Sequence, residues 1–323
     1  MTNNRALYAK YWWRHVEARP GMLAALEKLP RFLATVAVSK HRLFVWMEAP
    51  TLPDHAVFAF ARADDYFFGV LQSRFHEVWA LKQGTRLETR PRFTPTTCFE
   101  TFPFPFRDDL EEPLDNTEAV LNAAKHYAHI VLREEPPPYG SRRRREETLI
   151  SSEKNESQSL VTSTPTTPEE HRAAIAAAAK ELNTLRERWL NPPEWTVEKI
   201  LEFPGSTGGA WQRYLDAKTV DAKTGVGTVR YPRLEPRDAD CAAKLKTRTL
   251  TKLYNERPAW LDLAHKKLDA AVAAAYGFPA DLTDEQILEK LLALNLERAA
   301  EEAKAAKVKK PRAQRTKEAD ELV

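Results

Sequence analysis

The sequence predicts an α+β protein, in which a mixed sheet-and-helix N-terminal domain precedes a mostly α-helical C-terminal region. Three runs rich in β-branched and aromatic residues predict strands of one sheet: FLATVAVS, HRLFVWM and AVFAFA, all between residues 32 and 61. After residue 167, apolar residues recur instead at the spacing of amphipathic helices. A chain of 323 residues is long enough for two modest domains.

Changes in amino-acid composition along the chain predict five segments. A first domain at residues 1–110 is followed by a helical connector at 111–133. Prolines, an arginine run and many Ser and Thr residues then predict a linker with little fixed structure at 134–167. A helical region at 168–300 and a basic tail at 301–323 complete the chain.

Within the first domain, residues Tyr8–Leu29 carry apolar side chains near helical spacing, which predicts one helix, or two short helices divided at Arg19-Pro20-Gly21. A second helix of about five turns is predicted over Asp65–Leu81. Asp64 and Asp65 supply N-cap chemistry for it, and Gly84 marks its end.

In the second half, Thr167 and Glu170 have the spacing of a capping box, so a helix is predicted to begin at Pro168. Its apolar face carries Ile175, Ala179, Leu182, Leu185 and Trp189. Three further helices are predicted, at Ala242–Glu256, Pro258–Tyr276 and Asp284–Ala300.

Composition excludes some protein classes. No apolar run approaches the roughly 20 residues that a membrane span needs, and Met1–Lys10 holds no signal-peptide core, so we expect a cytoplasmic protein with no membrane partner. Cys98 and Cys241 lie far apart and are predicted to be buried and reduced. The net charge is only +3, but bases outnumber acids in residues 1–106 and in 303–317, a distribution that permits contacts to phosphates.

The segment from Ser39 to Phe106 contains SKHRLFVW, ADDYFFGVLQSRFHEVWALKQG and TPTTCFETFPFPF, in that order. This ordered set resembles the target recognition domain of the MmeI-like class I SAM-dependent DNA methyltransferases, which are single-chain restriction-modification enzymes. The run LRERWLNPPEW and residues Thr249–Arg298 resemble the C-terminal region of the same family. The resemblance implies a module that recognises double-stranded DNA for an adenine-specific methyltransferase.

The residues that transfer a methyl group are not apparent. The run Asn191–Trp195, NPPEW, has Glu194 where an N-P-P-aromatic motif requires a ring, and its prolines are suited to ending a helix. The glycine-bearing runs GSTGGAW and TGVGT do not follow an apolar strand, as a SAM-binding turn would. There is neither a nuclease motif nor a metal-ligand spacing of His with Cys or acids. We therefore expect no catalytic residue, bound cofactor or metal in this chain.

Family members carry a nuclease domain, a helical connector and a methyltransferase domain ahead of the resembling region. The resemblance therefore implies SAM for a full-length enzyme or for a partner. We expect either a truncated or split gene, or a separate methyltransferase and nuclease polypeptide.

Candidate base-readout residues lie in TRLETRPRF, where Arg86, Glu88, Arg90 and Arg92 alternate along the chain. In one extended strand all four would project from the same face, and Arg and Glu discriminate guanine and cytosine edges. An edge strand with charges that prevent aggregation has the same pattern. The resemblance favours DNA, because sequence-specifying side chains of the family lie in this domain.

Candidate contacts to the DNA backbone are Lys40, His41 and Arg42, at a predicted strand junction, and Arg74. A charged turn is the alternative for the first three. Arg74 shares the apolar side of its helix, so an acid could instead hold it in the core. The alternating Phe102, Phe104 and Phe106 are assigned to packing and not to base stacking.

Three hypotheses follow. The main one is a DNA recognition module that lacks a catalytic domain. The second is a complete DNA methyltransferase with a SAM site that the sequence does not reveal. The third is an interaction module for a partner other than DNA, with charged faces that keep it in solution.

Overall fold

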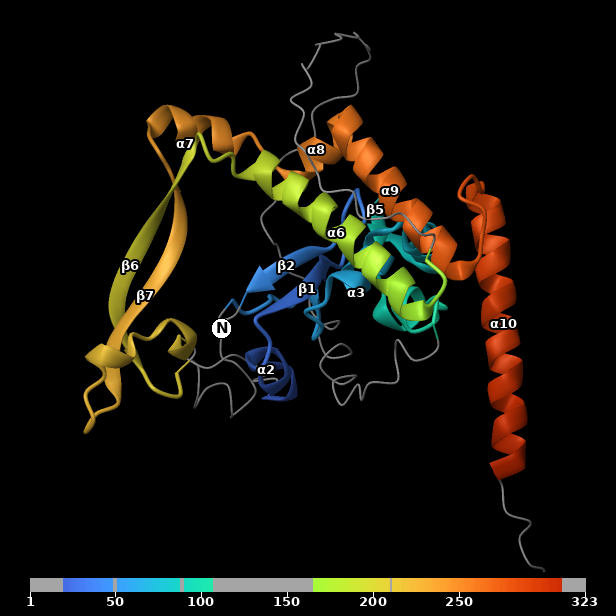
Figure 1. Cartoon of the computed structure of the whole chain (residues 1–323), viewed down its shortest axis with the longest axis horizontal. Coiled ribbons are helices and arrows are strands. Elements are labelled where there is room, and N and C mark those ends of the chain that lie inside the picture. The colour runs from blue at the N-terminus through green and yellow to red at the C-terminus, as the bar shows by residue number, and fades with distance from the viewer. Residues whose placement is uncertain (1–19, 49–50, 88–89, 107–164, 210, 310–323) are drawn as a thin grey trace, which may run out of the picture.

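The computed structural model describes residues 20–48, 51–87, 90–106, 165–209 and 211–309 (Figure 1). A three-stranded sheet with flanking helices is followed by helices and one long β-hairpin. The predicted fold class, α+β with a mostly helical C-terminal region, is confirmed. The expected connector at 111–133 and most of the expected linker at 134–167 lie outside the described residues.

The N-terminal sheet contains β1 (Arg31–Val36), β2 (Val45–Glu48) and β3 (Val57–Phe60). It is antiparallel in the order β2-β1-β3, so the prediction of one sheet is confirmed. Its two faces enter different apolar clusters: Phe32 and Ala34 face α2 (Pro20–Glu27), whereas Leu33 joins the main core. Because side chains alternate along a strand, both faces are buried. The part of the predicted Tyr8–Leu29 helix before residue 20 is not described.

The helix predicted over Asp65–Leu81 is two helices, α3 (Asp65–Gln72) and α4 (Arg74–Gln83). Asp64 caps α3 as predicted, accepting a hydrogen bond from Phe67 N at 2.8 Å. The break is at Ser73, which is extended (φ −70°, ψ 158°) and whose hydroxyl donates to Val70 O at 2.7 Å. A serine side chain that bonds to nearby backbone competes with the helix, and a break of one residue barely disturbs the apolar periodicity.

The C-terminal region begins with α6 (Pro168–Leu190), which has the predicted capping box between Thr167 and Glu170. The single helix predicted at 242–256 is also two helices, α7 (Ala239–Lys246) and α8 (Leu250–Glu256), because Thr249 begins a new one by capping Lys252 N. The next helix, α9 (Ala259–Tyr276), ends at Gly277 with φ 68°, in the left-handed region that favours glycine.

The last helix, α10 (Asp284–Lys309), begins at the predicted Thr283/Gln286 box. It continues past the predicted end at Ala300, so the described part of the predicted 301–323 tail is helical. Figure 1 shows the C-terminal half of α10 extending away from the other helices.

A long antiparallel hairpin, β6 (Thr196–Ser206) with β7 (Val226–Pro236), was not predicted within the helical region. Figure 1 shows it at the edge of the molecule opposite α10. Much of it is exposed, so its sequence lacks the strong alternation of a half-buried strand. Arg213, between the two strands, donates to Leu29 O and Pro30 O at 2.6 and 2.7 Å, which ties the connecting segment to the corner between α2 and β1.

One apolar core joins the N-terminal domain to the C-terminal helices. It includes Phe68 and Leu71 of α3, Ile175 and Leu182 of α6, and Leu268 of α9. Figure 1 shows α6 passing across α3. At their closest approach, a Cβ added to Gly69 would lie 2.7 Å from Ile175 Cγ2 and 2.9 Å from Ala179 Cβ, so only glycine fits there. The geometry of the N-terminal domain therefore depends on the helices behind it.

Candidate nucleic-acid interface

The predicted base-readout residues lie on a short hairpin and not on one strand. Its strands are β4 (Thr85–Leu87) and β5 (Arg90–Arg92), paired antiparallel. Arg86 pairs with Pro91, whereas Leu87 pairs with Arg90 and Thr85 with Arg92. Since paired residues share a face and neighbours alternate, Arg90 and Arg92 project from one face and Arg86 from the other.

The predicted common face for all four side chains is therefore wrong in its geometry. Glu88 comes between the two strands in the sequence and lies outside the described residues. A pattern of alternating charges is the same whether the chain forms one strand or a short hairpin, so the sequence did not distinguish them. The roles of these residues in base readout stay predictions.

The hairpin is held by close backbone contacts at its open end, where Thr85 pairs with Arg92. A Cβ on Gly84 would lie 2.6 Å from Arg92 O and 2.7 Å from Ala80 O, so the chain turns from α4 into β4 through a space that only glycine fits. On the other side, Val38 bridges Arg92, and Ser39 N donates to Pro91 O at 3.3 Å. The loop at 37–42 therefore lies against β5.

Arg42 is placed differently from its prediction as a contact to the DNA backbone. It is only 4% exposed, and its guanidinium donates to Val36 O at 2.5 Å and to Thr35 Oγ1 at 3.2 Å. It also stacks on the Phe93 ring, 4.9 Å from the centroid, and burial lowers its pKa to about 10. Its donors thus hold the loop at 37–42 to the sheet, and in this structure they are not presented to a phosphate.

Lys40 and His41 remain on the surface side of that loop. Lys40 is exposed, and its Nζ donates to Asn255 Oδ1 at 2.5 Å. His41 Nε2 lies 2.9 Å from the same oxygen. Asn255 belongs to α8, so the loop is joined to the C-terminal helices by a residue that is 215 positions away from Lys40.

Arg74 is held by an acid, as the alternative interpretation has it, but at a half-exposed position. Its Nε donates to Asp284 Oδ1 at 2.8 Å, and its Nη1 donates to Leu282 O at 2.8 Å. Its backbone N–H donates to Asp269 Oδ1 at 2.8 Å. Ser73, the N-cap residue of α4, makes no capping hydrogen bond with its side chain. Arg74 therefore joins α4 to α9 and α10, and these contacts occupy much of its donor capacity.

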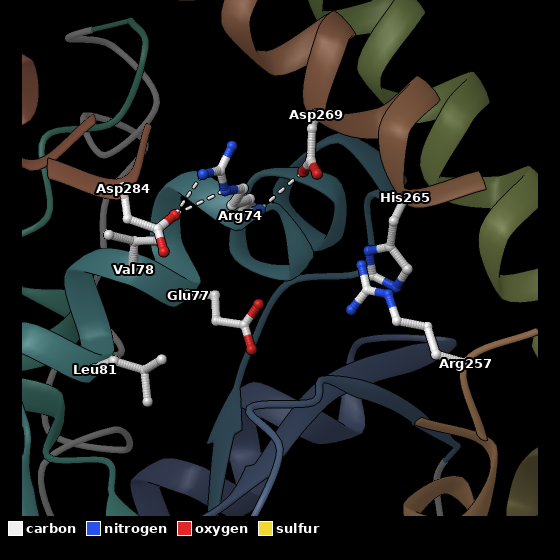
Figure 2. Close-up of a pocket in the computed structure, with 8 residues that line it drawn as sticks. All are labelled: Arg74, Glu77, Val78, Leu81, Arg257, His265, Asp269 and Asp284. Atoms are coloured by element: carbon white, nitrogen blue, oxygen red, sulfur yellow. Dashed lines mark hydrogen bonds and ion pairs between the residues drawn. The ribbon is translucent and has the colours of Figure 1, made fainter. Parts of the chain in front are cut away.

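A cleft of about 310 Å³ lies beside Arg74 and is lined by charged residues of α4, α9, α10 and the α8–α9 corner (Figure 2). Burial raises the pKa of Asp269 to about 6 and also raises the pKa of Glu77. Burial lowers the pKa of His265 to about 4, and its Nε2 lies 2.8 Å from Tyr254 Oη.

Most of these charged groups are engaged in joining elements. Arg257, which has a left-handed backbone with φ 41°, pairs with Asp262 at 3.0 Å. Arg74 donates to Asp284, and His265 is hydrogen-bonded to Tyr254. Among the described residues that line the cleft, Glu77 has a carboxylate to which no hydrogen-bond donor is assigned. We therefore treat the cleft as part of the junction between the two regions and assign it no reaction.

The remaining candidates have structural roles. Phe102 and Phe104 are buried, as predicted. His76, whose ring contacts those of Phe44 and Phe102, is fully buried, and burial lowers its pKa to about 3. Asn191 is the C-cap residue of α6. The guanidinium of Arg248 lies over the Trp195 ring, 4.2 Å from the centroid of that ring. Cys98 and Cys241 are free and buried, as predicted.

Neither a metal centre nor a membrane span is found in the described ranges. Within them, no three His, Cys, Asp or Glu side chains are grouped so that they could hold a metal ion. None of the helices in these same ranges is both long and apolar enough to cross a membrane.

Sequence reasoning missed Asn255 altogether. Its place in LYNERP carries no local pattern of a binding residue, and only the fold brings it to Lys40. The nearest available hint was the family resemblance of Thr249–Arg298, which includes it.

Residues 27–106 match the family model described as "MmeI, target recognition domain". A comparison with curated proteins finds no match. One solved structure that the chain resembles is that of the Type IIL restriction-modification enzyme MmeI in complex with DNA, with a TM-score of 0.45 and 16% identity, over 85% of this chain and 22% of that chain. The part of the chain from residue 27 to residue 106, which includes the sheet, the loop at 37–42 and the β4–β5 hairpin, is therefore a target recognition domain of the MmeI family.

Proposed function

We propose that this chain is the sequence-specific DNA recognition module of an adenine-specific DNA methyltransferase in a restriction-modification system. The observation that carries the proposal is the match of residues 27–106 to the MmeI target recognition domain. That segment contains the β4–β5 hairpin and the basic loop beside it. The partner is double-stranded DNA.

The hairpin has the chemistry for base readout. A two-stranded ribbon fits the major groove of B-DNA, and an arginine guanidinium forms paired hydrogen bonds with N7 and O6 of guanine. Arg90 and Arg92 project from one face of the hairpin, so both side chains would enter the groove together. Backbone anchoring through Gly84 and Ser39 keeps this face in a fixed orientation.

Methyl transfer is assigned to another part of a larger enzyme or to a separate methyltransferase and nuclease polypeptide. SAM would be held there. Purified chain mixed with tritiated SAM and DNA should transfer no methyl groups, and addition of a methyltransferase polypeptide encoded beside it should restore transfer. Robust transfer by the chain alone would contradict this assignment.

Binding to DNA is tested by fluorescence anisotropy with a labelled random duplex at two salt concentrations. We expect binding that weakens steeply as salt rises, because each phosphate contact releases a counterion. Absence of binding at low salt would contradict the proposal and would favour an interaction module for another partner.

A further inference from the structure

The donor and acceptor roles in the contact between Lys40, His41 and Asn255 can be assigned. An ammonium group only donates hydrogen bonds, so the Asn255 atom that lies 2.5 Å from Lys40 Nζ must be the carbonyl oxygen Oδ1. The same oxygen lies 2.9 Å from His41 Nε2. Because a carbonyl oxygen only accepts, Nε2 is assigned as the ring nitrogen that carries the proton. One amide oxygen thus holds two basic side chains of the loop at 37–42.

This orientation leaves the Nδ2 amino group of Asn255 with two donors. Asn255 is exposed, and among the described residues no acceptor is recorded for Nδ2. Lys40 keeps two further N–H donors, because an ammonium has three. The cluster therefore presents several donors and a positive charge to solvent.

The position of the cluster relates it to the predicted readout hairpin. Ser39 N donates to Pro91 O, and Val38 bridges Arg92, so the loop carrying Lys40 and His41 runs directly beside β5. The ring of Tyr254, next to Asn255, lies 5.9 Å from the ring of His41. The loop thus lies between the hairpin on one side and α8 on the other.

We infer that Asn255 of α8 completes a phosphate-binding site of the DNA-recognition surface. Its Oδ1 positions Lys40 and His41, and its Nδ2 donates to the same stretch of DNA backbone that Lys40 neutralises. Contacts of Lys and Asn side chains to phosphate oxygens fix the register of a protein on a duplex without selecting a sequence. The C-terminal helical region then takes part in DNA binding beside the target recognition domain. This inference rests on the proposed function.

Four variants of the full chain test it by fluorescence anisotropy over a range of salt: Asn255→Ala, Lys40→Ala, the double variant, and Asn255→Asp. Lys218→Ala, which removes an exposed lysine of the segment between β6 and β7, is the matched control for loss of surface charge. Melting temperatures are measured for each, so that loss of folding is separated from loss of binding.

We expect Lys40→Ala to weaken binding by about 3- to 10-fold and to reduce the salt slope by about 1. Asn255→Ala should weaken binding to a similar extent and also lower the slope, although it changes no charge, because Lys40 is then no longer held at its phosphate. The double variant should bind more tightly than the product of the two single effects predicts, since the residues act together. Asn255→Asp keeps the acceptor for Lys40 but loses the donors and adds a negative charge, so it should bind at least as weakly as Asn255→Ala.

The outcomes separate the inference from the function on which it rests. Failure of the wild-type chain to bind DNA would contradict the proposed function itself. Wild-type binding with an unchanged affinity and salt slope in Asn255→Ala would overturn the inference alone. Wild-type affinity in Asn255→Asp would overturn the phosphate contact of Nδ2, and a loss in Lys218→Ala equal to that in Lys40→Ala would show that only overall charge matters.

Discussion

Arg186 of α6 donates from Nη2 to the main-chain carbonyl of Phe44 at 3.0 Å, immediately before β2. Its Nη1 lies 3.4 Å from Gln72 Oε1, which in turn accepts from Phe44 N at 2.9 Å. Arg186 is 1% exposed, so this polar network is enclosed where the C-terminal helices meet the target recognition domain. The recognition domain and the helices are therefore expected to unfold together.

Replacement of Arg186 tests that dependence. Arg186→Ala leaves a cavity and an unpartnered buried carbonyl at Phe44, and should lower the free energy of unfolding by about 3 kcal/mol. Arg186→Met fills much of the space and removes a buried charge, so it should lose less. Urea unfolding monitored by circular dichroism gives both values. An Arg186→Ala protein as stable as wild type, or wild-type unfolding in two separate transitions, would contradict the shared network.

The close approach of α3 and α6 predicts the effect of one methyl group. Gly69→Ala places a Cβ 2.7 Å from Ile175 Cγ2 and should destabilise the protein by about 1 to 3 kcal/mol through overpacking. Gly21→Ala is the control, because a Cβ on Gly21 in α2 meets nothing within 4 Å. That change should be neutral or should stabilise by up to about 1 kcal/mol. Equal thermal shifts for the two variants would show that the α3–α6 contact is looser than described.

Asp269 makes stability depend on pH. Burial raises its pKa from 3.8 to about 6, so between these values the folded chain binds a proton that the unfolded chain has released. Its contribution to stability is therefore present at low pH and is lost as pH rises through about 6. Buried His76 and His265, whose pKa values are lowered to about 3 and about 4, act in the opposite direction as pH falls below 6.5.

The Asp269→Asn variant isolates this effect, since an amide oxygen can still accept the Arg74 N–H. Relative to wild type, the variant should gain about 1 kcal/mol of unfolding free energy between about pH 5 and about pH 7.5. Urea unfolding of both proteins at each pH provides the difference. A difference that stays constant with pH would mean that Asp269 has an ordinary pKa.

Local chemistry made much of the fold predictable from sequence. The three strands follow from β-branched and aromatic runs, and the caps at Thr167 and Thr283 depend on residues only three positions apart. Features that depend on a single side-chain hydrogen bond, such as the break at Ser73, were not predictable, because the apolar periodicity continues across it. The β6–β7 hairpin was missed since most of its side chains face solvent on both sides.

The candidate site was predicted less completely than the fold. Lys40–Arg42 and Arg86–Arg92 were selected from their charge patterns, and the family resemblance favoured DNA as their partner. The match of residues 27–106 covers both groups. Tertiary packing decides which basic side chains of the loop are exposed. Lys40 lies at the surface, whereas Arg42 is buried and donates hydrogen bonds to the sheet. Asn255 reaches Lys40 only in the folded chain.

The most direct test of DNA recognition by this chain is selection of duplexes from a random pool, carried out with wild-type protein and with Arg90→Ala. We predict that wild type enriches one defined sequence, and that Arg90→Ala binds this sequence about 1 to 3 kcal/mol more weakly and loses its preference at one base pair. Lys218→Ala should enrich the same sequence as wild type. Enrichment of no sequence by the wild-type chain, at a salt concentration where it binds DNA, would contradict sequence recognition by this domain.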